Sequence, residues 1–507
     1  MKKGRRPASR TVYCPKLCDL LFPMEQRPKV QSYLSQVRAR LDLEPRHVER
    51  LLEDHVKAVF RLTQRGMGLE EALRVLDPSR LGDFYRDERR DWYPLDTAAK
   101  LYPMSMSPRR MAIFRLSAYL RAPVEPELMQ MALTYVMRRF PYFATSVKAG
   151  VFWHYVDGVK RHFAVSAEHG LPCSVMPFGR GTSPALRVSY FENRVSVEFF
   201  HALTDGTGGC VFLMTLVRTY LRLMGHEVPD GPEGLPLDEP SAPCETADGF
   251  TLAADAPGAR GFADRPALQM RGIPGYEQPC RVLHFNLPTQ ALSAQAREKG
   301  VTVTTLMLGY LFLAARAACP QRPSRRQIQI QLPVNMRRFY PVGTLRNFSL
   351  YASVRLAPAD ITGLDGILPA VARQVEEGVR KEALDATLRL SRRLVRSLRL
   401  VPLFIKRPIA YFIFGMLGDG VFTTTLSNLG LLRASKEMES LVEKIDFVLG
   451  PPSRSRACCA MASFGGTTVL TVTKSTQHSA FEDALYNLLC DGGLRPRVEG
   501  TRGGGGT

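Results

Sequence analysis

The segment HALTDGTGG at residues 201–209 carries the side chains best suited to proton transfer. An imidazole has an unperturbed pKa near neutrality, so His201 is a candidate general base. Asp205 follows within the same segment. A simpler interpretation also fits, in which Asp205 only caps a helix and the His-x-x-x-Asp-Gly pattern has arisen by chance. Three glycines there allow backbone or substrate to approach closely, namely Gly206, Gly208 and Gly209.

A hairpin and a helix are predicted on either side of this segment. Residues 186–200 form two alternating apolar and polar runs that meet at Glu192 and Asn193. This pattern predicts a β-hairpin whose second strand runs into His201. Apolar residues at helical spacing then predict a helix that ends at Gly225. A loop between a strand and a helix can hold an imidazole rigidly.

The chain of 507 residues is too long for one hydrophobic core, so we expect two or three packed units. Apolar residues recur at helical spacing from Val48 to Phe60, with Pro45 before them and Gly66 after them. From Asp91 onward, short strands and helices alternate, as in an α/β domain. The expected division is a helical extension at 1–85, a first lobe at 86–227, a crossover linker at 228–275, a second lobe at 276–495 and a flexible tail at 496–507.

The second lobe is also predicted to be α/β. Its expected elements are a strand at 281–286, a helix ending near Gly300, a helix at 304–318, a strand at 327–332 and a hairpin turning at Gly465 and Gly466.

Charge and cysteine usage limit the partners. Lys and Arg outnumber Asp and Glu by 68 to 48, and the net charge of +20 favours polyanions. Nucleic acid is the least favoured polyanion, because the sequence carries no nucleic-acid-binding module. The ten cysteines include no CxxC pair, and Cys458 and Cys459 are expected in a buried strand. Neither cysteines nor histidines show metal-ligand spacing, so we expect reduced thiols and no metal.

Export and membrane-spanning signals are weak. The basic start, MKKGRR, is followed by an apolar stretch that Asp19 and Pro23 interrupt, so we expect no export. No window reaches the roughly 20 apolar residues that a spanning helix needs. We therefore expect a cytoplasmic protein, soluble or attached to a membrane surface. The sequence also has no GxSxG, GxxxxGK[ST] or HExxH motif.

Three strings in order resemble a known family. They are FFHALTDGTGG at 199–209, LPVNMRRFYPVGTLRNF at 332–348 and TTLSNLG at 424–430. Together they resemble the coenzyme-A-dependent acyltransferases with a His-x-x-x-Asp-Gly motif, which include chloramphenicol acetyltransferase, condensation domains and alcohol acetyltransferases. The resemblance covers residues 90–490 and is greatest to the alcohol acetyltransferase-like branch. Condensation domains usually carry a second His where this chain has Phe200.

The resemblance implies two similar α/β lobes with a channel between them. It implies that His201 deprotonates an alcohol or amine acceptor, which attacks the thioester of acyl-coenzyme A, with acetyl the expected acyl group. It also implies that Asp205 forms a structural ion pair with an arginine. Arg337 is the candidate partner, while a solvated role for Arg337 and its neighbour Arg338 competes with this.

Several polar residues near the second and third strings have competing interpretations. Ser427 and Asn428 are candidate oxyanion donors or channel-lining groups, and they equally suit a turn before Gly430. Asn335 has the same ambiguity. Asn347 is expected to fix a turn rather than to touch substrate.

Residues 388–418 combine a basic helix with an apolar run. Such a segment can make peripheral contact with a membrane, can pack with a solvated basic face, or can attract the phosphates of coenzyme A. Pro402 and Pro408 are expected to break it, which favours the packed helix. The basic residues are Arg389, Arg392, Arg393, Arg396 and Arg399.

Three hypotheses follow for function. The first is an acyl-coenzyme-A-dependent O- or N-acyltransferase with His201 as base. The second is a non-catalytic binding or scaffold protein of the same fold. The third keeps the chemistry and takes the acyl group from a separate carrier protein, as condensation-type enzymes do.

Overall fold

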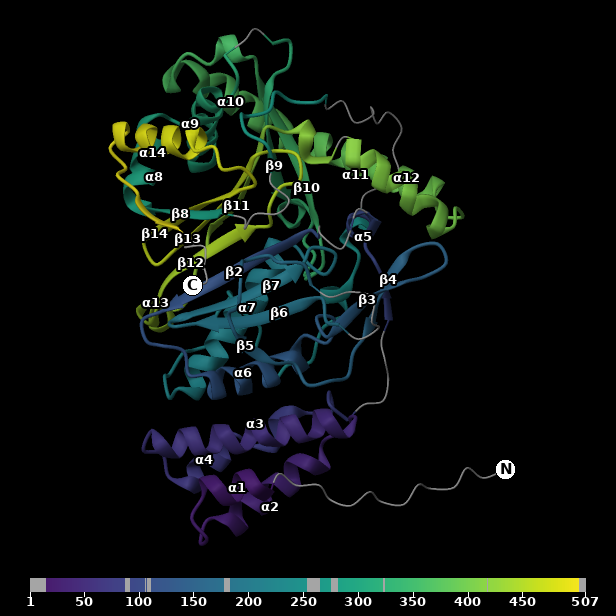
Figure 1. Cartoon of the computed structure of the whole chain (residues 1–507), viewed down its shortest axis with the longest axis vertical. Coiled ribbons are helices and arrows are strands. Elements are labelled where there is room, and N and C mark those ends of the chain that lie inside the picture. Colours follow the sequence, from purple (N-terminus) through teal and green to yellow (C-terminus); the bar gives the residue numbers. More distant parts are fainter. Residues whose placement is uncertain are drawn as a thin grey trace.

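The computed structural model describes residues 15–86, 92–104, 106, 111–176, 183–252, 265–274, 281–321, 324–416 and 418–500. Within them the chain forms a helical extension and two α/β lobes arranged along the long axis of the molecule (Figure 1). This is the mixed α/β class with two lobes that the sequence predicts. Residues 501–507 of the expected tail at 496–507 lie outside the described residues.

The extension is helical, as expected, and it packs on the first lobe. Its helices are α1 (Pro15–Leu21), α2 (Arg27–Ala39), α3 (Pro45–Gln64) and α4 (Leu69–Val75). α3 begins at Pro45, whose fixed φ suits a first helical turn, and Gly66 follows its end with a φ of 92°. α3 packs against α6 (Pro126–Arg139), so the extension and the first lobe share one hydrophobic core.

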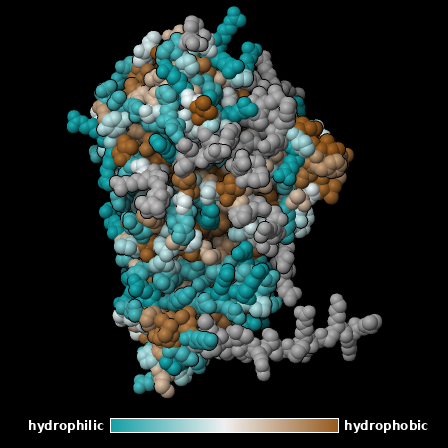
Figure 2. Space-filling model, viewed as in Figure 1, coloured by the Kyte–Doolittle hydropathy of each residue, from teal (hydrophilic) through white to brown (hydrophobic). Residues whose placement is uncertain are grey.

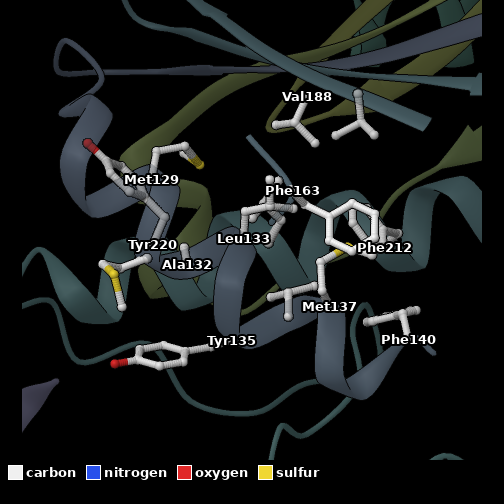
Figure 3. Packing of buried hydrophobic residues seen from close by; sticks show 14 of the residues in the cluster. Met129, Ala132, Leu133, Tyr135, Met137, Phe140, Phe163, Val188, Phe212 and Tyr220 are labelled. Carbon is white, nitrogen blue, oxygen red and sulfur yellow. The ribbon is translucent and has the colours of Figure 1, made fainter. Parts of the chain in front are cut away.

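The first lobe is built on a five-stranded sheet with the order β12-β2-β7-β6-β5. Its strands are β2 (Ile113–Leu120), β5 (Val165–Ala167), β6 (Leu186–Phe191), β7 (Arg194–Phe200) and β12 (Val442–Leu449). β6 and β7 form the predicted hairpin, and Glu192 in its turn takes a φ of 50°. α6 and α7 (Gly206–Leu223) cover the sheet. Figure 3 shows Leu133 of α6, Val188 of β6 and Phe212 of α7 gathered in this core.

One strand of this sheet comes from late in the chain. β12 pairs antiparallel with β2, with Asp446 opposite Ser117, and Phe447 is buried in the core of the first lobe. The sequence division placed all of 276–495 in the second lobe, so the structure differs from it here. Hydrophobic alternation indicates a strand and its buried face, and it carries no information on which distant strand will be the neighbour.

The second lobe has a seven-stranded sheet with the order β10-β9-β11-β13-β14-β8-β15. Its strands are β8 (Arg281–Pro288), β9 (Ile328–Asn335), β10 (Ser349–Leu356), β11 (Thr424–Leu431), β13 (Ala457–Phe464), β14 (Thr467–Lys474) and β15 (Arg497–Gly500). The accompanying helices are α8 (Thr289–Glu298), α9 (Val303–Ala318), α10 (Leu364–Gly378), α11 (Lys381–Ser397), α12 (Leu403–Met416) and α14 (Ala480–Asp491). The short helix α13 (Lys436–Leu441) contacts β12 and buries Met438 in the core of the first lobe. The predicted strands, helices and Gly465–Gly466 turn are all present. Cys458 and Cys459 are buried in β13, as expected.

Two expectations about chain ends and breaks need correction. Arg497–Gly500 forms an edge strand paired with β8, where a flexible tail was expected from residue 496. Pro408 lies inside α12 and does not break it, whereas Pro402 does separate α11 from α12.

A small sheet and a short helix complete the part of the chain that positions the site. The sheet has the order β1-β4-β3, with β1 (Trp92–Pro94), β3 (Thr145–Ala149) and β4 (His154–Gly158), and α5 (Leu101–Met104) follows β1. Among the described residues no single helix is long and apolar enough to span a membrane; α8 and α9 pass that test only as a pair, bent by 88°.

Candidate active site

His201 stands directly after β7, as the hairpin pattern predicts. Its backbone N–H donates to the carbonyl of Ala112 at 2.7 Å, which prolongs the β2–β7 pairing. The imidazole stacks on Tyr102 of α5, with ring centroids 4.6 Å apart and planes at 19°. The ring also meets Phe114 edge-on at 5.1 Å. These aromatic contacts on two sides set the plane of the imidazole.

Asn347 fixes the tautomer of this ring. His201 Nδ1 lies 3.0 Å from Asn347 Oδ1, and Asn347 Nδ2 lies 3.5 Å from Asp96 Oδ2. An ionised carboxylate only accepts hydrogen bonds, so with Asp96 ionised the amide nitrogen faces Asp96 and the amide oxygen faces the imidazole. His201 Nδ1 therefore donates, and the lone pair of the neutral ring is on Nε2. Asn347 was expected to fix a turn rather than to touch substrate, and the contact with His201 is a role that the sequence did not indicate.

Asp96 is a buried carboxyl behind Asn347. Its Oδ1 accepts the Ala99 N–H at 2.7 Å, and Arg346 Nε lies 3.8 Å from its Oδ2. Burial raises the pKa of Asp96 to about 7, and the nearby Arg346 opposes that rise. His201, Asn347 and Asp96 thus form a chain of polar contacts from the site into the protein.

The surroundings of His201 favour its neutral form. Burial lowers the pKa of the imidazole below 6.5, and the charge of Asp205 together with the hydrogen bond to Asn347 only partly offsets this. As a residue, His201 is half-buried. At neutral pH the ring is therefore unprotonated and can accept a proton.

Asp205 is turned away from His201 and is fully engaged. Its Oδ1 caps α7 by accepting the Gly208 N–H at 3.1 Å. Its Oδ2 accepts the Phe348 N–H at 2.8 Å and pairs with Arg337 Nη1 at 2.8 Å. The two interpretations of the sequence are thus both present, because Asp205 is a helix cap and also an ion-pair partner.

Arg337 is held from several sides, so it is not a solvated arginine. It lies in the 3₁₀ turn Met336–Arg338 after β9, where Asn335 Oδ1 accepts its backbone N–H at 3.0 Å. Its guanidinium also donates to the carbonyls of Thr344 at 2.9 Å and Arg346 at 2.5 Å. The pair with Asp205 therefore joins the motif loop of the first lobe to two segments of the second.

Known proteins resemble this chain in three-dimensional structure but not detectably in sequence. No family model matches the sequence, and no curated protein matches it. A trichothecene 15-O-acetyltransferase from Fusarium sporotrichioides is similar in structure, with a TM-score of 0.55 at 12% identity, over 80% of this chain and 95% of that one. Polyketide synthase associated protein 5 from Mycobacterium tuberculosis gives a TM-score of 0.51 at 14% identity, over 79% and 96%. TRI101 of F. graminearum, in complex with ethyl coenzyme A, gives 0.50 at 12% identity, over 78% and 96%.

The chain has the two-lobed chloramphenicol-acetyltransferase-like fold. The similarity covers about four fifths of this chain, and at 12% and 14% identity it shows the fold alone.

In this fold the motif glycines allow close packing around the loop. A Cβ on Gly208 would lie 2.2 Å from the carbonyl oxygen of Leu345, and a Cβ on Gly206 would lie 2.7 Å from Leu429 of β11. The Gly208 contact is with backbone, which cannot move as a side chain can. These glycines let the second lobe approach the loop that carries His201.

The other sequence candidates lie around the loop with different partners. Asn428 donates to Thr304 Oγ1 at 2.9 Å and accepts the Gly430 N–H at 2.7 Å, which is the turn role of its two interpretations. Ser427 is half-buried in β11, opposite Ala460 of β13. Asn335 holds Arg337 in place and also donates to Thr207 at 3.2 Å.

Sequence reasoning missed Asp96, Tyr102 and the role of Asn347. Asp96 and Tyr102 precede the motif by about a hundred residues and show no catalytic spacing to it. Their one signal is the string YPLDTAAKLY, which joins aromatic residues to a carboxyl in a segment expected to begin the first lobe. Among the described residues no group of three or more His, Cys, Asp or Glu side chains could hold a metal.

Proposed function

We propose that this protein is an acyltransferase that moves an acyl group, with acetyl the first choice, from coenzyme A to an alcohol or amine. The observation that carries the proposal is the environment of His201: Nδ1 is engaged by Asn347, which leaves Nε2 as the basic atom of a neutral ring. The two-lobed acyltransferase fold supports the same chemistry.

His201 would act first as base and then as acid. Nε2 takes the proton of the acceptor O–H or N–H while the acceptor atom attacks the thioester carbonyl carbon. The resulting tetrahedral intermediate collapses, the C–S bond breaks, and the imidazolium returns the proton to the leaving thiolate. The products are an ester or amide and the free thiol of coenzyme A. A positioned general base contributes about 10²- to 10⁴-fold to such a step.

Asp205 and Arg337 would act through position. Both oxygens of Asp205 already accept hydrogen bonds, so this carboxylate is not the proton acceptor. Its role in the proposal is to hold the loop that presents His201.

Ser427 is our candidate for a donor to the oxyanion of the intermediate. It is half-buried in β11, close in sequence to Leu429, which packs beside Gly206 of the motif. Asn428 is less suited to this role because Thr304 and Gly430 already engage its amide. A fixed donor of this kind contributes roughly 3 kcal/mol.

Coenzyme A is favoured as donor for two reasons. The net charge of +20 suits a substrate with several phosphates, and TRI101, a structure of similar fold, holds ethyl coenzyme A. The acceptor is a small alcohol or amine in this proposal.

The test is release of free thiol from acetyl-coenzyme A with a panel of alcohols and amines, with the acylated product measured by mass. The same panel is run with an acetylated carrier protein as donor. Acceptor-dependent release with coenzyme A, matched by product, supports the proposal. Transfer from the carrier alone would favour the condensation-type reaction, and no transfer from any donor would favour a binding protein.

A further inference from the structure

The junction of α11 and α12 exposes large apolar side chains. Leu400, Phe404 and Ile409 are 71%, 76% and 55% exposed, and Ile405 is exposed beside them. The sequence favoured a packed helix with a solvated basic face, and Leu388 and Leu403 are indeed buried, whereas these four apolar side chains lie outside the core. Figure 1 shows α12 projecting from the side of the second lobe, and Figure 2 shows hydrophobic residues gathered there.

The loop between β3 and β4 extends this apolar surface from the first lobe. Val151 and Phe152 at its tip are 71% and 40% exposed. The loop touches the start of α12, since the Val151 carbonyl accepts the Leu403 N–H at 2.8 Å. Beneath it, Lys406 Nζ lies 3.3 Å from the centre of the Trp153 ring. The two segments therefore hold their apolar tips in one fixed arrangement.

Arginines accompany the apolar tips. Arg393 and Arg396 of α11, Arg399 of the turn after it and Arg407 of α12 are exposed. We use the name α12 face for these four arginines together with the apolar residues Val151, Phe152, Leu400, Phe404, Ile405 and Ile409.

A partner of the α12 face must supply negative charge for the arginines and an apolar environment for the apolar side chains. A second copy of the chain would place arginines against arginines in a molecule of net charge +20, which opposes self-association through this face. A nucleic acid would pair with the arginines and leave Phe404 and Leu400 in water. An anionic bilayer meets both needs, because its headgroups attract the arginines and its acyl boundary accepts the apolar side chains.

We propose that the α12 face binds the surface of an anionic lipid bilayer. The face adjoins the candidate active site, since α12 packs against α5, whose Tyr102 stacks on His201. Binding would place that side of the molecule at the membrane while the helices remain parallel to its surface. This proposal concerns attachment and does not depend on the acyl transfer proposed above.

The experiment is co-sedimentation of the full chain with vesicles of phosphatidylcholine alone and of phosphatidylcholine with phosphatidylglycerol. Two double variants test the two components of the face: Phe404→Ser with Ile409→Ser, and Arg399→Glu with Arg407→Glu. We expect binding to the anionic vesicles that falls at least about tenfold in each variant and weakens with added salt. Trp153 provides a second readout, because its fluorescence should change when vesicles cover the face.

Matched controls come from the extension, which forms one end of the molecule away from α12 (Figure 1). Leu20→Ser with Met24→Ser changes two side chains that are also exposed, and Arg50→Glu with Arg74→Glu reverses two exposed charges. These controls should bind as the unaltered chain does. The proposal is overturned if the unaltered chain does not bind anionic vesicles, if the α12-face variants bind as well as the controls, or if the face instead mediates dimerisation in sedimentation velocity.

Discussion

Replacing Asp205 with Asn tests whether the aspartate of the motif acts through structure. Asp205 accepts two backbone N–H groups and pairs with Arg337, and its side chain is only 5% exposed. An amide keeps one oxygen, so its NH₂ group must face either the Gly208 N–H or both the Phe348 N–H and the guanidinium, and all of these are donors. In either orientation Arg337 loses the charge of its carboxylate partner and keeps carbonyl and amide oxygens.

The loss of unfolding free energy in Asp205→Asn follows from these contacts. Leaving a buried cation without its charged partner, and one buried donor without an acceptor, costs about 3 kcal/mol. For a cooperative unit of the size of one lobe, that corresponds to a fall of roughly 6–12 °C in melting temperature. We expect thiol release to fall together with the melting temperature, because the loop that presents His201 is held by this pair.

The assay is thermal melting followed by circular dichroism, beside the thiol-release rate. Glu376→Gln is the matched control, since it removes an ion pair with Arg380 whose side chains are 73% and 60% exposed. That change should cost under about 0.5 kcal/mol. An Asp205→Asn protein that is inactive and melts as the parent does would refute the structural role and point to direct participation in the reaction.

Three further predictions concern the same site. Asn347→Ala should lower kcat by about 100-fold with a smaller effect on KM, because the imidazole loses the partner that fixes its tautomer; equal kcat values would contradict this. Burial lowers the pKa of His201 below 6.5, so kcat/KM should be constant above neutrality. It should fall only as the pH drops through that lowered pKa, because the base then becomes protonated. A fall in kcat/KM centred above pH 7 would contradict this prediction. Gly208→Ala should cost about 2–3 kcal/mol in thermal melting, because its Cβ would meet the Leu345 carbonyl oxygen at 2.2 Å, and an unchanged melting temperature would count against that packing.

Local features of this chain are readable in its sequence. Pro45 and Gly66 delimit α3, the Glu192–Asn193 turn joins β6 to β7, and the second strand ends at His201. Each of these depends on backbone preferences of a few neighbouring residues, so a single sequence carries the information. The ion pair of Asp205 with Arg337 came from the family resemblance, since 132 residues separate the two positions.

Features that depend on distant pairing were not predictable. Asn347 reaches Asp96 across 251 positions of the chain, and no periodicity connects them. The pairing of β12 with β2 likewise follows from three-dimensional packing. On α12, a run of apolar residues looks the same whether it faces the core or the solvent, so the exposure of Phe404 required the structure.

The most direct test of the central claim is the rate of acceptor-dependent thiol release from acetyl-coenzyme A by the unaltered chain and by His201→Ala. His478→Ala, which removes an exposed imidazole, serves as the control. We predict a loss of about 10²- to 10⁴-fold in His201→Ala, with no change in the control and with acylated acceptor equal to thiol released. Equal rates in the parent chain and His201→Ala would contradict the account.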